Sequence, residues 1–304
     1  MEGTNMSDKT SELTNRTIGF IGLGFMGKPM ARNLQAAGAT MIIHSRSAGP
    51  VEELVAEGMT GAASPADVAA QAEMVILMLT DTTAVELVLT GPSGILTGLT
   101  ADTLVIDMGT TLMTTTQALA AKVHDAGGAY LDAPVSGGTM GAEAGTLTIM
   151  AGGDDDAMDR AAPLFDVMGA KTTHVGGIGA GQVAKAANQV IVGLTIGAVA
   201  EGLSLARKAG IDPAKVREAL GGGFADSRIL EVHGKRMVDK TFAPGAKSTI
   251  QRKDMDQAET LAARLGMEMP ATTLNRKLYD RMIAAGHGDL DHAALIAAID
   301  PGAI

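Results

Sequence analysis

The chain has 304 residues, 46% of them hydrophobic and 19% charged, and its formal net charge is −10. This length fits two compact domains better than one. The absence of cysteine excludes disulfides, thiolate nucleophiles and zinc–thiolate sites. A negative net charge with only 2% aromatic residues argues against a nucleic-acid partner, which would need a basic footprint and stacking platforms.

The first fifteen residues are polar, carry charges of both signs and contain no apolar core, unlike a secretory signal. We predict a disordered leader over residues 1–15. Apolar runs such as Val75–Leu79 have the length of a strand, and none has the length that a membrane span requires. The sequence therefore predicts a cytoplasmic protein without a membrane partner.

Short apolar runs alternate with helix-like segments from Thr17 to about Val175. Nearly continuous apolar strands between helices are typical of a parallel sheet that is covered on both faces. We predict an α/β domain over residues 16–177, with a Rossmann-type, doubly wound and mostly parallel sheet. The predicted strands are Thr17–Gly22, Thr40–His44, Met74–Leu79, Thr103–Asp107, Ala129–Asp132, Thr146–Ala151 and Lys171–Val175.

The pattern changes at Gly176–Gly179, after which strand-like runs disappear. A helix is predicted from Ala180 to Ala209, and about 30 residues in a helix would span ~45 Å. Asp212 as N-cap and Pro213 at the first helical position begin the next helix. We predict an all-α domain over residues 178–304, for substrate binding and oligomerisation, joined to the first domain by the long helix.

The first predicted strand runs directly into Gly22-Leu23-Gly24-Phe25-Met26-Gly27, a GxGxxG motif that opens a helix. The first glycine permits a tight turn, the second lets a pyrophosphate approach the backbone, and the third allows close packing of helix on strand. The helix N-terminus then faces the phosphates. The strand–turn–helix context favours a dinucleotide site over a purely structural glycine turn.

The second predicted strand ends at His44 and is followed by Ser45, Arg46 and Ser47. An NAD-selective site usually has Asp or Glu here for the ribose 2′-hydroxyl, and this sequence has neither between Thr40 and Val51. Arg46 could instead bind a 2′-phosphate, although it could also be a solvated loop cation. NADP(H) is therefore favoured over NAD(H).

Two further segments combine polar groups with glycine or alanine. The turn Ser136-Gly137-Gly138 offers a hydroxyl and backbone N–H groups that suit a carboxylate, but a loop that simply needs positive φ would look the same. On the long helix, Lys185 and Asn188 share one face, with Gln189 one turn from the lysine. Burying such groups is costly unless they have partners, although a lysine can also extend its head to solvent.

These segments, together with Lys253-Asp254 in the helical half, occur in the order found in the β-hydroxyacid dehydrogenase family, which this chain resembles from Thr17 to about Ile299. The resemblance implies that Lys185 is the catalytic acid/base and that a small carboxylate-bearing substrate binds at Ser136, Gly137 and Gly138. Many members carry Asn four residues after the lysine, whereas this chain has Gln189 there and Asn188 at three. Either amide could contact the substrate.

The resemblance also implies a nicotinamide cofactor and a homo-oligomer, either a dimer or a tetramer. Leu79, Thr80 and Thr110 would line the nicotinamide side of the cofactor, and Lys253 would reach it from the helical domain. The segments 185–189 and 242–245 are most similar to those of members that reduce tartronate semialdehyde (2-hydroxy-3-oxopropionate) to glycerate. Alternatives within the family are 3-hydroxyisobutyrate dehydrogenase and reductases of glyoxylate or succinic semialdehyde. A non-catalytic dinucleotide sensor would predict a damaged lysine site, and both lysine motifs are intact.

No metal site is predicted, because the six histidines show no paired ligand spacing. Three consecutive aspartates, Asp154–Asp156, stand where a helix begins. Acidic side chains there complement the helix dipole, which favours a structural role over a cation site.

Overall fold

The computed structural model describes residues 13–304, and the chain divides into two compact units after Lys185, inside the long helix α9. Most of the predicted leader lies outside the described residues. Its last part, however, belongs to the packed chain, because Leu13 is buried and its N–H donates to the Ala37 carbonyl at 3.3 Å.

Within the described residues, the N-terminal unit contains a nine-stranded sheet with the order β3-β2-β1-β4-β5-β6-β8-β7, and β9 pairs with β8. The β6–β8 and β7–β8 pairs are antiparallel and the others are parallel. The strands are β1 (Thr17–Ile21), β2 (Thr40–His44), β3 (Thr60–Gly61), β4 (Met74–Leu77), β5 (Leu104–Asp107), β6 (Ala129–Asp132), β7 (Val135–Ser136), β8 (Leu147–Gly152) and β9 (Gly169–Gly176).

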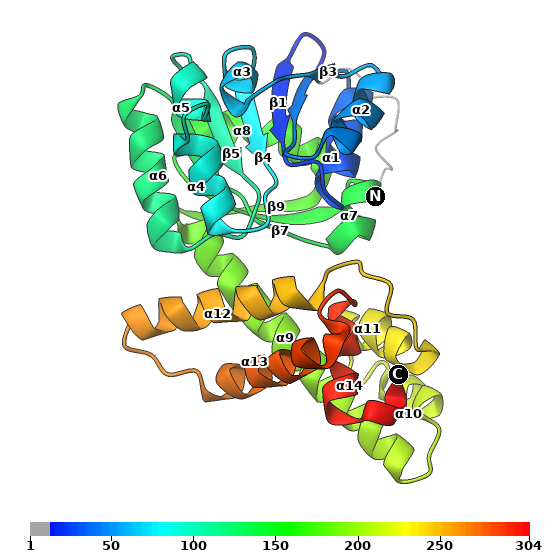
Figure 1. The fold of residues 1–304 in the computed structure, drawn as a ribbon. Helices are drawn as coiled ribbons and strands as arrows, with labels where there is room; N and C mark the ends of the chain where they lie inside the picture. Colours follow the sequence, from blue (N-terminus) through cyan, green and yellow to red (C-terminus); the bar gives the residue numbers. More distant parts are fainter. Residues whose placement is uncertain (1–12) are drawn as a thin grey trace. The chain divides into compact units, whose positions relative to one another are not determined.

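Helices cover both faces of this sheet (Figure 1). One core contains side chains of α1, α2, α7 and α8, and the other contains side chains of α3 to α6. The helices are α1 (Gly27–Ala36), α2 (Ala48–Ala56), α3 (Pro65–Ala69), α4 (Thr82–Thr90), α5 (Ile95–Gly98), α6 (Met113–Asp125), α7 (Gly138–Ala144) and α8 (Asp155–Met168).

The central strands β4 and β5 are buried at every position because successive side chains enter opposite cores. In β4, Met74 and Ile76 join the core under α1 and α8, whereas Val75 and Leu77 join the core under α3 to α6. Burial on both faces requires an apolar residue at each position, which explains the continuous apolar runs in the sequence. The predicted fold class is confirmed. The strands β3 and β7, which the pattern missed, have only two residues each, too few to show any period.

The C-terminal unit is helical among the described residues, as predicted. Its core packs Ile196, Ala200 and Leu203 of α9 against side chains that include Tyr279 and Met282. Its elements are α9 (Ala180–Lys208), which begins in the first unit, α10 (Pro213–Leu220), α11 (Arg228–Asp239), α12 (Ser248–Arg264), α13 (Pro270–Met282), a π-helical turn (Ile283–His287), a 3₁₀ turn (His292–Leu295), α14 (Ile296–Ile299) and a second 3₁₀ turn (Pro301–Ala303).

The helix α10 begins as its sequence predicts. The Asp212 side chain accepts a hydrogen bond from the Ala214 N–H at 2.9 Å, and Pro213 occupies the first helical position.

The helix α9 has 29 residues and is apolar enough to cross a membrane by length and composition. The expectation that no segment reaches this length was therefore wrong, because glycine and alanine between the larger apolar residues extend the run beyond a strand. Of its most apolar 18-residue window, 44% is buried inside the structure. Its buried side chains form the core of the helical unit, the usual place for such a helix in a globular protein.

Candidate active site

The carboxyl ends of five strands lie in one row across the sheet. Ile21 pairs with both His44 and Leu77, Leu77 pairs with Asp107, and Asp107 pairs with Asp132. Because these strands are parallel, the segments that follow them all leave the sheet at the same edge. They are 22–27, 45–47, 78–80, 108–111 and 133–138, and they contain every site residue predicted for the first unit except Lys185. Ligands of open α/β sheets bind at this edge.

The fingerprint turn after β1 allows close backbone approaches. Gly22 has φ +104°, and a Cβ on it would lie 2.4 Å from the Met78 carbonyl oxygen. A Cβ on Gly27 would lie 1.9 Å from the Gly22 carbonyl oxygen, whereas one on Gly24 would meet no protein atom within 4 Å. Leu23 is buried and Phe25 is 63% exposed. The first and third glycines are therefore required by the fold itself, and the second leaves open space at the turn.

The loop after β2 carries an exposed cation without an acidic neighbour. Arg46 is exposed, and no hydrogen bond or ion pair of its side chain occurs among residues 13–304. Two of the acidic residues that follow are engaged elsewhere, since Glu53 accepts from Lys28 at 2.7 Å and Glu57 accepts from Arg32. This environment leaves Arg46 available to an anion.

The loops after β4 and β5 contact each other. A Cβ on Gly109 would lie 2.8 Å from the Leu79 carbonyl oxygen, so the segment that carries Leu79 and Thr80 approaches the segment that carries Thr110. A hydrogen bond of 3.1 Å from the Leu112 N–H to the Thr82 hydroxyl also joins the two segments. The structure thus brings together the three residues that were predicted for the nicotinamide side.

Two buried carboxylates end the strands β5 and β6, and sequence reasoning assigned no role to either. Asp107 accepts hydrogen bonds from the Gly109 N–H at 3.0 Å and the Thr111 hydroxyl at 3.1 Å. Asp132 accepts from the N–H groups of Gly179 at 2.7 Å and Gln182 at 2.8 Å, at the start of α9. The sequence feature that could have identified both residues is an aspartate at the end of an otherwise apolar strand.

Burial changes the protonation of both groups, because desolvation disfavours a charged carboxylate. It raises the pKa of Asp107 to about 7 and that of Asp132 to about 6, although the hydrogen bonds that each accepts act in the opposite direction. Asp107 is therefore largely protonated in the folded chain in mildly acidic solution.

Asp107→Asn is expected to remove part of the pH dependence of stability. A folded pKa above the unfolded value of 3.8 means that Asp107 contributes stability below about pH 4 and loses it as the pH rises through about 7. Between pH 5 and pH 8, the wild type should lose about 2–4 kcal/mol of its free energy of unfolding through Asp107, and the variant should not show this loss. Urea unfolding at the two pH values measures this, with exposed Asp125→Asn as the control. Equal pH slopes for wild type and Asp107→Asn would contradict it.

Lys185 lies beside the Ser136-Gly137-Gly138 turn. Its side chain is only 8% exposed, and its Nζ donates to the Val135 carbonyl at 2.7 Å, one residue before Ser136. Gly137 and Gly138 have φ of +138° and +60°. The loop does need positive φ, as the alternative stated, and the Lys185 ammonium is bonded to the backbone one residue before Ser136.

In the second unit, the two amides that follow the lysine are in different environments. The buried Gln189 donates from Nε2 to Asp254 Oδ2 at 2.6 Å and to Gln251 Oε1 at 3.1 Å. Its Oε1 accepts from Asn188 Nδ2 at 2.7 Å. The Lys253 ammonium lies 2.9 Å from Asp254 Oδ1. Gln251 and Asp254, which sequence reasoning did not select, thus connect α12 to the amides of α9.

One cluster of metal-ligating type occurs among the described residues, where His233, Asp291 and His292 offer ligand atoms within 4.8 Å of one another. Asp291 already accepts from the Ala293 N–H, and Arg236 lies 2.9 Å from its other oxygen. Burial alone would raise the pKa of Asp291, but the hydrogen bond from His233 and the charges of His292 and Arg236 hold it below its usual value. These contacts, and the positive charge of Arg236, oppose a cation at this place.

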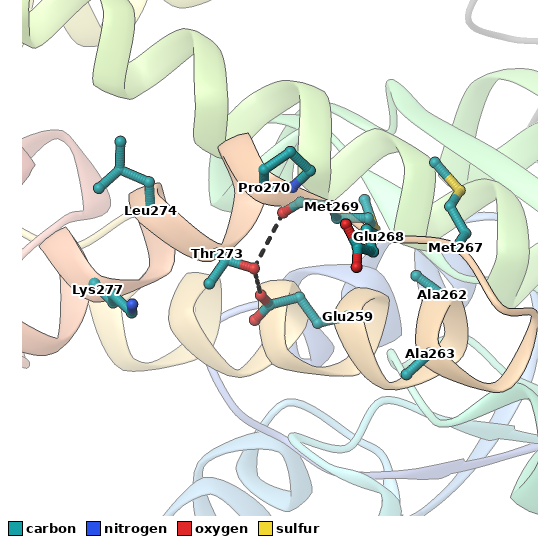
Figure 2. Close-up of a pocket in the computed structure, with 10 residues that line it drawn as sticks. All are labelled: Glu259, Ala262, Ala263, Met267, Glu268, Met269, Pro270, Thr273, Leu274 and Lys277. Atoms are coloured by element: carbon teal, nitrogen blue, oxygen red, sulfur yellow. Dashed lines mark hydrogen bonds between the residues drawn. The ribbon is translucent and has the colours of Figure 1, made fainter.

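The hollow in Figure 2 lies between α12 and α13 and contains none of the predicted site residues. It measures about 510 Å³. Its carboxylate Glu259 accepts hydrogen bonds from Thr273 and Arg276. Glu259 is thus already paired, and we assign no function to this hollow.

Two family models together match most of the chain. The NAD binding domain of 6-phosphogluconate dehydrogenase matches residues 17–176, and the NAD-binding domain of NADP-dependent 3-hydroxyisobutyrate dehydrogenase matches residues 179–299.

Similar proteins match over nearly their whole length. The chain is 45% identical to 2-hydroxy-3-oxopropionate reductase of Escherichia coli over 93% of its own residues and 97% of that protein. It is 33% identical to the NAD-dependent L-serine dehydrogenase of Pseudomonas aeruginosa, over 94% and 98% of the two chains. Among solved structures, 3-hydroxyisobutyrate dehydrogenase of Mycobacterium tuberculosis with L-serine has a TM-score of 0.85 and 32% identity, covering 94% of this chain and 99% of that one.

Proposed function

Because this chain belongs to the β-hydroxyacid dehydrogenase family of NAD(P)-dependent oxidoreductases, we propose that it reduces tartronate semialdehyde to glycerate with NADPH. The observation that carries the proposal is the buried Lys185, whose Nζ lies 2.7 Å from the Val135 carbonyl, directly before the Ser136 turn. The choice of aldehyde rests on the 45% identity to 2-hydroxy-3-oxopropionate reductase. A 3-hydroxyisobutyrate dehydrogenase, or a reductase of glyoxylate or succinic semialdehyde, is the alternative.

In the proposed reaction, the substrate carboxylate accepts hydrogen bonds from the Ser136 hydroxyl and from the N–H groups of Gly137 and Gly138. The bound nicotinamide cofactor, held by Gly22–Gly27 and the loops that carry Leu79, Thr80 and Thr110, supplies the hydride that reaches the aldehyde carbon. As the carbonyl π bond breaks, negative charge grows on its oxygen, and the Lys185 ammonium donates a proton to it. The products are the alcohol and the oxidised cofactor. A positioned acid of this kind contributes about 10²–10⁴-fold.

Of the two amides after the lysine, we assign substrate contact to Asn188 and a supporting role to Gln189. Both Nε2 bonds of Gln189 go to α12, and its Oε1 receives the Asn188 amide. Asn188 follows Lys185 by three residues on one helix, so the two lie on the same helix face. Its Oδ1 can accept from a substrate hydroxyl, while Gln189 holds the orientation of the carboxamide. Lys253, paired with Asp254, would approach the cofactor from α12.

The preference for NADPH is assigned to Arg46, with Ser45 and Ser47 beside it, because a guanidinium without an acidic partner suits the 2′-phosphate. Arg46→Ala is expected to raise the KM for NADPH about 10–100-fold, the value of one charge-assisted hydrogen bond. The KM for NADH should change little. Initial rates with each cofactor measure this, with Arg16→Ala, an exposed arginine paired with Glu73, as the control. An equal increase in KM for both cofactors would show that Arg46 does not bind the 2′-phosphate.

The proposed activity is tested by initial rates of NADPH and NADH oxidation with tartronate semialdehyde, glyoxylate, succinic semialdehyde and methylmalonate semialdehyde. The highest kcat/KM with tartronate semialdehyde and NADPH would support the full proposal. A higher value with another aldehyde would overturn the substrate and keep the reaction class. NADPH binding without turnover on any of the four would favour a dinucleotide sensor over this proposal.

A further inference from the structure

Gln182 lies in the first turn of α9, three residues before Lys185, and its side chain is buried at 2% exposure. Its Oε1 accepts a hydrogen bond from the Thr111 N–H at 3.0 Å, and its Nε2 donates to the Gly109 carbonyl at 3.0 Å. One carboxamide therefore binds the backbone on both sides of Thr110. A carboxamide can do this at any pH, because it is neutral and carries both a donor and an acceptor.

The loop that Gln182 contacts is also held by hydrogen bonds to Asp107, the last residue of β5. Asp107 accepts from the Gly109 N–H and from the Thr111 hydroxyl, and this hydroxyl forms a second hydrogen bond of 2.7 Å with Thr116. Gln182 thus contacts a segment that is already fixed to the end of β5. The two hydrogen bonds of its carboxamide therefore fix α9 directly to this segment.

The same helix turn is anchored to β6. Asp132 accepts from the Gln182 backbone N–H at 2.8 Å, and the Lys185 Nζ donates to the Val135 carbonyl at 2.7 Å. Side chains three residues apart on a helix lie about 5–6 Å from each other at Cβ. The Gln182 side chain therefore binds the loop that bears Thr110, while its backbone belongs to the same helix turn as Lys185.

We propose that Gln182 is a positioning residue for the reaction, which sets the location of the nicotinamide-side loop relative to the Lys185 ammonium. This inference rests on the proposed function, in which Thr110 lines the nicotinamide and Lys185 donates the proton. Hydride transfer and proton transfer must act on the two ends of one carbonyl bond, so a small displacement between their donors lowers the rate steeply. Cofactor affinity, which depends mainly on the Gly22–Gly27 turn and the Arg46 loop, does not depend on this contact.

Gln182→Ala is expected to lower kcat for aldehyde reduction about 10–100-fold, in line with the effect of a displacement of about 1 Å. The dissociation constant for NADPH should stay within about twofold, because the residues that bind the phosphates are untouched. The deuterium isotope effect on kcat, with NADPH labelled at the transferred hydrogen, should increase. Gln117→Ala is the matched control, since Gln117 also donates to a backbone carbonyl near the start of α9, that of Ile178 at 3.3 Å, but does not touch the loop at 109–111. Its kinetics should equal those of the wild type.

Gln182→Glu provides a second test that does not require the loss of the side chain. A carboxylate retains the acceptor for the Thr111 N–H but faces the Gly109 carbonyl without a proton, whereas the neutral acid can donate to it. The kcat of this variant relative to wild type should therefore rise as the pH falls, a rescue that a purely structural role would not produce. If Gln182→Ala proves unfolded by circular dichroism, this pH profile alone decides the question.

Lys185→Met in the same assay separates the positioning role of Gln182 from the proposed function. If Lys185→Met abolishes turnover while Gln182→Ala keeps kcat within twofold of wild type, or while Gln117→Ala loses as much, the positioning role is refuted and the proposed function stands. If Lys185→Met turns over normally, Lys185 is not the proton donor and the positioning role loses its premise, whereas the proposed function fails only if the wild type itself reduces none of the four aldehydes.

Discussion

Lys185→Met is expected to lower kcat for aldehyde reduction by about 10²–10⁴-fold, the usual contribution of a positioned general acid. Methionine is close to lysine in length and can occupy the same buried channel, but it has no proton to donate. The change removes the hydrogen bond from the Lys185 Nζ to the Val135 carbonyl. The dissociation constant for NADPH should remain near the wild-type value, because the cofactor residues of the fingerprint turn are unaltered.

Single-turnover rates measure the loss in aldehyde reduction, and NADPH fluorescence titration measures the dissociation constant. Lys122→Met, on an exposed part of α6, is the control for the loss of a lysine charge and should keep the wild-type kcat. A kcat for Lys185→Met within threefold of the wild type would remove the lysine from the mechanism. A large rise in the dissociation constant would instead give it a role in cofactor binding.

Gly27→Ala is expected to destabilise the N-terminal unit and to weaken cofactor binding at the same time. Its Cβ would lie 1.9 Å from the Gly22 carbonyl oxygen, a backbone atom that cannot move without displacing the turn after β1. Overpacking of this kind costs about 1–3 kcal/mol in the free energy of unfolding. The displaced N-terminus of α1 should also raise the dissociation constant for NADPH about 10–100-fold, the equivalent of one lost hydrogen bond to a charged group.

Gly24→Ala separates these two effects. A Cβ there meets no protein atom within 4 Å, so the thermal midpoint without cofactor should equal that of the wild type. The same methyl group would occupy the space that the pyrophosphate needs, and the affinity for NADPH should fall. Gly49→Ala in α2, which also has open space, is the control that should change neither quantity. A Gly27→Ala variant with the wild-type midpoint would contradict the close approach at the turn.

The residues that sequence patterns could identify are those whose role depends on local structure. The fingerprint Gly22–Gly27 was recognisable because a strand, a glycine turn and a helix follow one another within a dozen residues. The strand β4 was recognisable because burial on both faces requires an unbroken apolar run, and the helix α10 because Asp212 and Pro213 mark its start. Helix geometry placed Lys185 and Asn188 on one face, and the resemblance to the β-hydroxyacid dehydrogenase family gave the lysine its predicted role.

The partners of buried polar groups could not be predicted in the same way. Asp132 binds the N–H of a residue 50 positions later in the chain, and Gln189 binds Asp254 at a separation of 65. Before the elements are packed, Gln182 and Gln251 are indistinguishable from exposed glutamines on a helix. The two-residue strand β7, which carries Ser136 to the end of the sheet, is too short for any periodic signal.

The sequence by itself determined the longer strands of the sheet, the position of the dinucleotide turn and the helix that carries the lysine, because hydrophobic period, glycine and caps act over a few residues. The tertiary structure alone decided which polar groups are buried and what they bind. The pKa of Asp107 rises because two layers of helices remove it from water, and the role of Gln182 exists because α9 begins beside the end of β5. Such properties depend on the distance between segments that are remote in the chain, and packing sets that distance.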